Sequence, residues 1–325
     1  MRAETRAFDI ESQPESDLAR AILRIVYTKR RLTEHSCSDS HHDVGCETCF
    51  ALHQGTVLRH VQRGIPLRMV LPAFPAKSPN PRKVLGPLPD MAEQLALSYL
   101  EGICERIKLI YPPGAVLTIC SDGRVFSDLV GVSDRDVSQY AFKLQAMLRR
   151  IGARSIDVLG LEDVFDDDDF DHVRTVLVER YGQPLDALRR SIKSSHSELA
   201  LFNGIARFLF EDALDLNPGE SRNAIRARCK DRAYRVIQRS HAWSNLIAAR
   251  YPHALRLSIH PYPAHSKKIG IFLLDAADNW LTPWHGVALR IGDRFTLTKR
   301  KHAEELQARL VHDEEGRPHY FSMEA

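Results

Sequence analysis

Two strand-like segments joined by a helical one place the strongest constraint on how this chain folds. Residues 116–120 and 155–159 have the length and β-branched content of strands, and residues 133–151 repeat apolar side chains at helical spacing. Parallel neighbouring strands need a crossover of about a dozen residues or more, which this helix supplies. The pattern predicts a Rossmann-like α/β unit.

The rest of the chain extends this pattern. Helices are expected over residues 17–32, 46–63 and 90–110, a strand over 67–71, and an almost wholly helical middle over 170–250. Strands return at residues 256–261, 268–274, 286–291 and 295–298, and Gly292-Asp293 is a good hairpin turn. The predicted fold class is therefore α/β, with a Rossmann-like mixed sheet, a helical insertion and antiparallel C-terminal strands.

Four parts follow from this assignment, without a clean domain boundary. Residues 1–65 are expected to form a helical segment packed on the core, and residues 66–165 the Rossmann-like part. Residues 166–251 form the mainly helical part, and residues 252–325 supply strands that join the main sheet. The best candidate boundaries lie near residues 165 and 252.

Composition excludes several classes of protein. Apolar content of 44% and charged content of 27% are ordinary for a globular chain, and a net charge of +3 gives no basic footprint for nucleic acid. No apolar run approaches the roughly 18 residues that span a membrane, and residues 1–14 lack the apolar core of a secretory signal. We expect a cytoplasmic protein that binds neither nucleic acid nor membrane.

A charged turn follows the strand at 116–120, where open α/β sheets bind their ligands. Ser121, Asp122 and Arg124 surround Gly123, whose positive φ would let the carboxylate and the guanidinium face one crevice. Opposite charges held there could bind a zwitterion or a phosphate and move a proton. The alternative is a salt-bridged surface turn.

A proline-rich loop over residues 72–89 carries the second candidate group. Its polar side chains suit a phosphate dianion on a stiff scaffold: Lys77, Ser78, Asn80, Arg82 and Lys83. The alternative is a solvated basic loop.

Further along, seven cations lie within eighteen residues of a predicted helix. Most of them are expected to face water, and Arg228 or Arg235 is the candidate ligand for an anion.

Two histidines at predicted strand ends are candidates for proton transfer. His260 ends one strand and His285 precedes another, and both titrate near neutral pH when unperturbed. Trp284 could form an aromatic wall for a substrate ring. The alternative for each histidine is a structural hydrogen bond.

One group of soft ligands could bind a metal. Cys46 and Cys49 would share a helical face with His53, and Cys37 could complete a zinc site. A single CxxC lacks its partner pair, so ordinary buried thiols and exposed imidazoles are the favoured alternative. The sequence contains no G-x-G-x-x-G, Walker, G-x-S-x-G or H-E-x-x-H motif.

Several segments in one order resemble the isocyanide (isonitrile) synthase family, also called the pyoverdine and dityrosine biosynthesis family. They span residues 70–290: LPAFPAKSPNPRKVLG (71–86), LPDMAE (88–93), YPPGAVLTICSDGRVFSD (111–128), SHAWS (240–244), LRLSIHP (255–261) and TPWH (282–285). The resemblance implies that the α-amine of an aromatic L-amino acid, tyrosine or tryptophan, becomes an isocyanide with ribulose 5-phosphate as carbon donor. It implies no required metal or organic cofactor, and a downstream oxygenase as a possible partner.

The resemblance also implies roles for the candidate residues. Lys77, Asn80, Arg82 and Lys83 would bind the phosphate with Lys267 or Lys268, and Arg124 the amino-acid carboxylate. Asp122 with His260 or His285 would move protons, and Arg256 would contribute to substrate binding. The alternatives are a non-enzymatic sugar-phosphate-binding protein and another phosphosugar lyase or transferase.

Overall fold

The computed structural model describes residues 13–33, 45–276 and 281–323. Its main sheet has five strands in the order β3-β2-β1-β4-β5, and every neighbouring pair is parallel. The bounds are Leu67–Pro72 for β1, Ala115–Cys120 for β2, Ile156–Leu159 for β3, Leu255–Ser258 for β4 and Ile269–Gly270 for β5. The chain builds outward from β1 to β3 and later returns to the other side of β1. The switch point of the topology therefore lies between β1 and β4, where sheets of this kind bind ligands.

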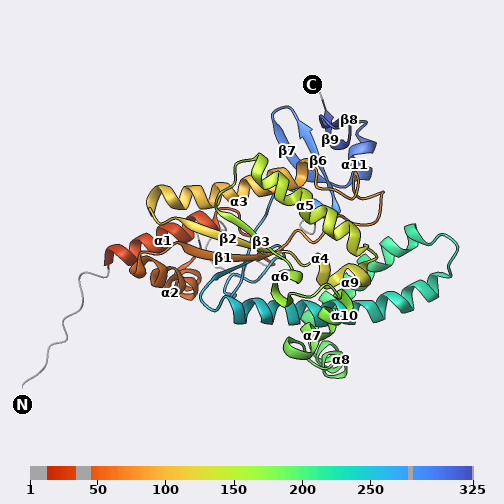
Figure 1. The fold of residues 1–325 in the computed structure, drawn as a ribbon, viewed down its shortest axis with the longest axis horizontal. Coiled ribbons are helices and arrows are strands. Elements are labelled where there is room, and N and C mark those ends of the chain that lie inside the picture. Colours follow the sequence, from red (N-terminus) through yellow and green to blue (C-terminus); the bar gives the residue numbers. More distant parts are fainter. Residues whose placement is uncertain (1–12, 34–44, 277–280, 324–325) are drawn as a thin grey trace, which may run out of the picture.

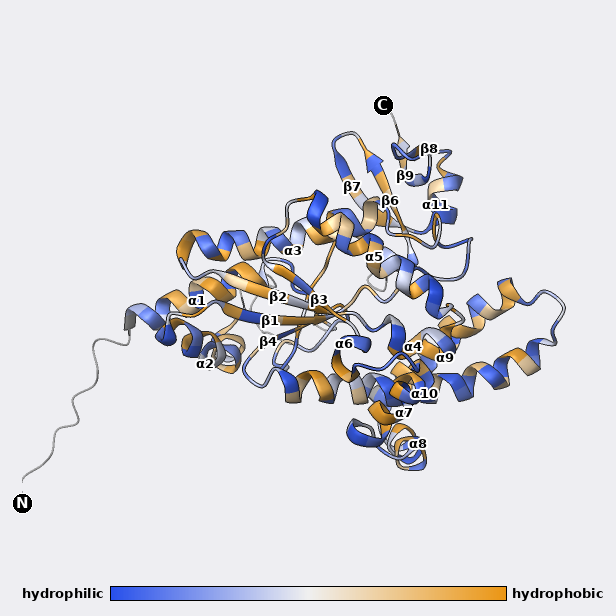
Figure 2. Cartoon of the chain, viewed as in Figure 1, coloured by the Kyte–Doolittle hydropathy of each residue, from blue (hydrophilic) through white to orange (hydrophobic). Residues whose placement is uncertain are grey.

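Helices cover both faces of this sheet (Figure 1). On one side α3 (Met91–Ile110) and α5 (Asp134–Arg150) pack on the strands, and α10 (Arg222–Arg250) crosses the other side. Alternate residues of β1 serve the two faces: Met69 belongs to the core with α3, whereas Val70 packs with Trp243 of α10. Figure 2 shows hydrophobic central strands between helices with hydrophilic outer faces. The fold class predicted from the sequence is confirmed.

The remaining helices flank this framework. Two of them, α1 (Gln13–Tyr27) and α2 (Glu47–Arg63), pack against each other and contribute to the core that α3 shares with the sheet. Between β3 and α10 the chain forms α6 (Glu162–Phe165), α7 (Phe170–Tyr181), α8 (Leu185–Ser194) and α9 (His196–Leu216). In Figure 1, α9 and α10 form a hairpin that extends beyond the sheet. The predicted helical middle is therefore present, with breaks that include residues 182–184 and 217–221.

The C-terminal strands correct one expectation. β4 and β5 extend the main sheet, but β6 (Val287–Ile291), β7 (Arg294–Thr298), β8 (Arg309–His312) and β9 (Pro318–Met323) form a separate four-stranded sheet. That second sheet is mixed, because β6 pairs antiparallel with β7 and parallel with β9. The hairpin turn at Gly292, with φ of 58°, is confirmed. The short helices η2 (Pro283–His285) and α11 (Arg300–Glu305) complete this part.

Helix α4 (Gly123–Val130) was not anticipated. It begins directly after the turn that follows β2, so the charged segment at 121–124 is a strand-to-helix junction. Eight residues gave too short a periodic pattern to recognise. Within the described residues, no helix combines the length and the apolar character that crossing a membrane requires.

Candidate functional site at the carboxyl end of the parallel sheet

The loops after β1, β2 and β4 leave the same edge of the sheet, next to the switch point. The loop after β1 begins at Ala73, Asp122 follows β2, and His260 follows β4. Because all strands are parallel, these three segments meet at one edge although up to 190 positions separate them in the sequence.

The first two loops touch through Gly123. A Cβ atom on this glycine would lie 2.0 Å from the carbonyl oxygen of Pro75, so no other residue fits without displacing backbone. Ser121 adds a hydrogen bond, its Oγ donating to the carbonyl oxygen of Phe74 at 2.9 Å. The expected positive φ at Gly123 was wrong: the described positive-φ glycines do not include it. Gly123 is needed because the loops after β1 and β2 approach each other closely, and Ser121 joins the two loops by its hydrogen bond.

Asp122 lies at the N-cap position of α4 without using its side chain as a cap. Its Oδ1 atom is buried, and the described part of the chain offers it no hydrogen-bond partner. Burial raises the pKa of Asp122 to about 7. A carboxyl group with such a pKa exchanges protons readily near neutral pH, as a general acid or base must.

Arg124 was expected to face the same crevice as Asp122, but its side chain packs among the neighbouring helices instead. Its guanidinium is buried, lies 3.9 Å from the centroid of the Phe170 ring, and forms ion pairs with Asp134 at 3.3 Å and Glu162 at 3.6 Å. It also donates hydrogen bonds to α5 at Ser138. These contacts hold α4 against its neighbouring helices, so Arg124 is engaged in structure.

Two cations meet at one hydroxyl group beside the switch point. Arg256 Nη2 donates to Ser244 Oγ at 2.8 Å, and Lys268 Nζ donates to the same oxygen at 3.0 Å. Burial and the neighbouring positive charge of Arg256 lower the pKa of Lys268 to about 8. Among the described residues, neither cation forms an ion pair with an acid. This arrangement is a ready anion site; we refer to Arg256, Lys268 and Ser244 as the anion triad.

His260 lies next to the anion triad. Its side chain is exposed to solvent, yet desolvation by the surrounding protein and the positive charges of Arg31 and Lys268 lower its pKa to about 4. The imidazole is neutral at physiological pH and can accept a proton from a bound reactant.

His285 is more constrained. Its Nδ1 lies 3.0 Å from Thr282 Oγ1, and its ring meets Phe208 edge-on at 4.7 Å. Burial, with the charges of Lys83 and Lys77, lowers the pKa of His285 to about 3. Trp284 beside it is only 2% exposed and packs on Phe74, so it cannot form the expected substrate wall.

Lys77 does not face a ligand. Its side chain is fully buried and forms ion pairs with Asp90 and Glu93, each at 2.8 Å. Burial alone would lower the pKa of Lys77, but the two carboxylates outweigh it and raise that pKa. Both carboxylates belong to the capping box of α3. Lys77 therefore anchors the proline-rich loop to the start of α3, which corrects its expected role in binding phosphate.

The other polar groups of the loop bind the helical hairpin. Asn80 is fully buried and donates its amide to Asp212 and Asp215 of α9, at 3.1 and 2.8 Å. Arg82 pairs with Asp215 and Lys83 with Asp212, each at 2.6 Å. Ser78 Oγ accepts a hydrogen bond from the backbone of Asn80. The loop's cations are thus neutralised, which corrects the expected phosphate clamp.

The remaining candidates on α10 and β5 are also accounted for. Arg228 forms a half-buried pair with Glu220, and Arg235 forms an exposed pair with Asp231. Arg228 stands about 24 Å along the helix from Ser244, at 1.5 Å per residue. Lys267 is exposed, next to Lys268. Arg228, Arg235 and Lys267 therefore do not contribute side chains to the anion triad.

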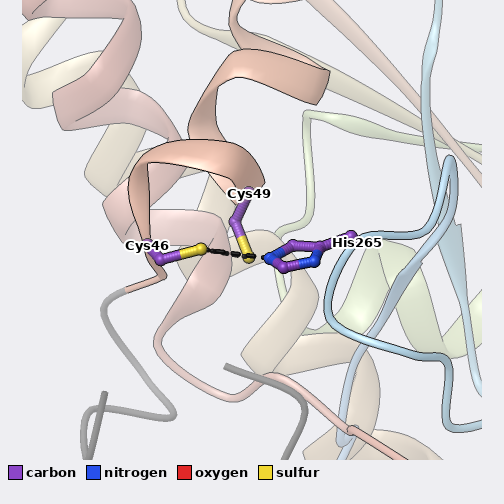
Figure 3. Close-up of side chains that lie close together, drawn as sticks. All are labelled: Cys46, Cys49 and His265. Atoms are coloured by element: carbon purple, nitrogen blue, oxygen red, sulfur yellow. Dashed lines mark hydrogen bonds between the residues drawn. The ribbon is translucent and has the colours of Figure 1, made fainter. Parts of the chain in front are cut away.

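Within the described residues, the structure also brings together a cluster of metal-ligating groups. Cys46, Cys49 and His265 have ligand atoms within 4.8 Å of one another (Figure 3). His265 comes from the loop between β4 and β5 and was not anticipated from the sequence. His53 does not belong to the cluster, which corrects that part of the prediction, and Cys37 lies outside the described residues.

The sequence reasoning missed Ser244 and Tyr262 at the main site. Ser244 belongs to the quoted SHAWS segment, so its hydroxyl was available as a signal. Tyr262 lies under Lys268, whose Nζ is 5.6 Å from the ring centroid. Nothing in the local sequence indicates that contact, because it depends on how the β4–β5 loop folds.

Comparison with known proteins adds to this geometry. A family model described as pyoverdine/dityrosine biosynthesis protein matches residues 57–311. The chain is 48% identical over 305 residues to the L-tryptophan isonitrile synthase AmbI2 of Fischerella ambigua, covering 94% of this chain and 92% of the relative. It is 44% identical over 311 residues to the L-tyrosine isonitrile synthase of Pseudomonas aeruginosa, covering 94% of each.

A solved structure agrees with the fold. The crystal structure of the PvcA protein from Pseudomonas aeruginosa superposes with a TM-score of 0.86 at 44% sequence identity, covering 94% of this chain and 99% of that one.

Proposed function

Because this chain belongs to the pyoverdine/dityrosine biosynthesis family, whose relatives described above are synthases, it is an enzyme, and we propose that it is an isonitrile synthase. The proposed reaction converts the α-amine of an aromatic L-amino acid, tyrosine or tryptophan, to an isocyanide. The proposed carbon donor is ribulose 5-phosphate. The observation that carries the proposal is the near end-to-end match to relatives named for this chemistry.

The anion triad is the proposed phosphate site. Arg256 and Lys268 carry two positive charges without acidic partners among the described residues, and Ser244 adds a hydroxyl between them. A phosphate dianion balances two cations, whereas a carboxylate would leave one charge unmatched. The cationic loop at residues 77–83 is less suited to this role, because its cations form ion pairs with Asp90, Glu93, Asp212 and Asp215.

Asp122 is the proposed proton-transfer group. Condensation of an amine with a ketone requires the ammonium to lose a proton and the carbonyl oxygen to gain protons. Asp122 has a buried oxygen, Oδ1, that lacks a partner in the described structure, and its pKa of about 7 lets it hold or release a proton. His260 is the proposed second acceptor, because it is neutral and solvent-accessible beside the anion triad.

Labelled sugar tests this proposal directly. The purified full chain is incubated with ribulose 5-phosphate uniformly labelled with carbon-13 and with L-tryptophan or L-tyrosine, and the products are analysed by mass spectrometry. We expect an isocyanide that contains one labelled carbon. Unphosphorylated ribulose serves as the control and should give little product, since it lacks the group that the anion triad binds.

The two alternatives give different results in the same experiment. A sugar-phosphate-binding protein without this activity would be stabilised by ribulose 5-phosphate but form no product. Another phosphosugar lyase or transferase would consume the sugar phosphate without adding a carbon to the amino acid. A downstream oxygenase that uses the isocyanide is part of the proposal and would be tested by adding such an enzyme to the product.

A further inference from the structure

We propose that Cys46, Cys49 and His265 bind a zinc ion that fixes the β4–β5 loop to helix α2. The three side chains come from two parts of the chain about 220 positions apart, and they converge in Figure 3. Two thiolates and one imidazole are a preferred ligand set for zinc. The ion would be structural, and this inference does not depend on the proposed reaction.

The separation of the two sulfur atoms fits tetrahedral coordination, and the sulfur–nitrogen separation is shorter than the tetrahedral value. The two sulfur atoms lie 3.7 Å apart, and Cys46 Sγ lies 3.1 Å from His265 Nε2. With Zn–S of about 2.3 Å and Zn–N of about 2.0 Å, a tetrahedral ion separates two sulfurs by about 3.8 Å and sulfur from nitrogen by about 3.5 Å. A disulfide would instead need about 2.05 Å between the sulfurs.

The surroundings support ligand binding. Arg30 Nη1 donates to Cys49 Sγ at 3.2 Å, the kind of outer contact that stabilises a metal-bound thiolate. Cys46 immediately precedes α2, and Gly45 before it has φ of 73° with a Cβ position 2.9 Å from the Tyr27 ring. The turn that presents the first thiol is therefore fixed against α1.

Zinc at this position has a clear mechanical consequence. His265 lies between His260 and Lys268 on the loop that joins β4 to β5. The same loop is held along residues 31–33 by hydrogen bonds between Tyr262 and the backbone of Arg31 and Thr33. A small cavity lined by Tyr27, His53, Ala264 and Lys268 lies beside it. A metal ion here would restrain the segment that carries two groups of the candidate site.

Metal analysis of the full chain tests the inference. The protein is purified with a reductant, and its zinc content is measured by inductively coupled plasma mass spectrometry. We expect one zinc per chain, and cobalt substitution should give a thiolate-to-cobalt charge-transfer band. Cys46→Ser, Cys49→Ser and His265→Ala should reduce the metal content to background. The matched controls are Cys229→Ala, a buried thiol in the helical hairpin, and His253→Ala, an exposed imidazole; both should retain the metal.

Two results would overturn the inference. The first is a reduced wild-type protein that takes up no stoichiometric zinc and shows no rise in Tm when zinc is added. The second is a metal content that Cys46→Ser and His265→Ala leave unchanged. A Cys46–Cys49 disulfide in metal-free protein, with no uptake after reduction, belongs to the first case. Because the wild-type measurement decides by itself, a variant that fails to fold does not leave the question open.

Discussion

Arg256 and Lys268 donate hydrogen bonds to one and the same oxygen, the hydroxyl of Ser244, at 2.8 and 3.0 Å. They reach it from β4 and from the residue before β5, on the side of β1 where the chain reverses its direction across the sheet. Like charges so close together cost free energy unless an anion joins them; burial and, after it, the charge of Arg256 lower the pKa of Lys268 to about 8. The pair is therefore the place where we propose that this enzyme binds its anionic reactant.

Removing one cation of the anion triad should weaken sugar-phosphate binding. We expect Arg256→Met and Lys268→Met each to raise KM for ribulose 5-phosphate by about tenfold to a hundredfold, because a hydrogen bond to a charged group contributes about 1.5–3 kcal/mol. Steady-state kinetics measures the effect. Lys267→Met is the matched control, since its side chain is exposed next door and should leave KM unchanged. Equal KM values for all three variants and the wild type would refute the assignment.

The affinity of the anion triad for phosphate should fall at alkaline pH. Lys268, with a pKa of about 8, is charged below that pH and loses its charge above it, so affinity for the phosphate should fall as pH rises through about 8. Phosphate becomes a dianion above about pH 6, which sets the lower limit. Lys268→Arg should move the alkaline limb of kcat/KM to higher pH, because arginine keeps its charge. An unchanged limb would show that another group titrates.

Asp122→Asn should abolish turnover without lowering the Tm. Burial raises the pKa of Asp122 from about 3.8 unfolded to about 7 folded, so the folded state binds the proton more tightly. The wild type therefore loses stability as pH rises from about 4 to about 7, whereas the amide cannot ionise. We expect similar Tm values at pH 4 and an increasingly higher Tm for the variant up to pH 7. Thermal melts in a pH series, with the labelled-sugar assay, test this; a large drop in Tm would make Asp122 structural.

Lys77→Met should damage folding instead of substrate binding. The change leaves two buried carboxylates, Asp90 and Glu93, without their cation, which costs about 3–5 kcal/mol in free energy of unfolding. Urea denaturation measures this loss, and adding Glu93→Gln should recover part of it. Arg235→Met is the control, because its exposed pair with Asp231 contributes less than about 1 kcal/mol. A stable Lys77→Met protein with a raised KM would restore the phosphate-clamp interpretation.

Local periodicity was sufficient to predict most of the framework. The crossover at residues 116–159, the long helix before Pro112 and the hairpin turn at Gly292 all depend on neighbours in sequence. Helix α4 was missed because it is only eight residues long. The destination of the last strands depends on pairings between distant segments, which the local pattern does not encode.

The candidate site was predictable in position but not in all its members. Asp122 follows a buried strand in a parallel sheet, so the sequence placed it at the ligand-binding edge. The prediction for Lys77, Arg82 and Lys83 was wrong because their acidic partners, at the start of α3 and on α9, are 13 to 133 positions away in the sequence. His265 was missed for the same reason, since its sulfur neighbour is 219 positions distant.

A crystal structure of the enzyme with ribulose 5-phosphate tests the central claim most directly. The account predicts phosphate oxygens within hydrogen-bonding distance of Arg256, Lys268 and Ser244, with the sugar ketone extending towards Asp122. A phosphate held instead by Arg82 and Lys83, with the pairs to Asp215 and Asp212 broken, would contradict it.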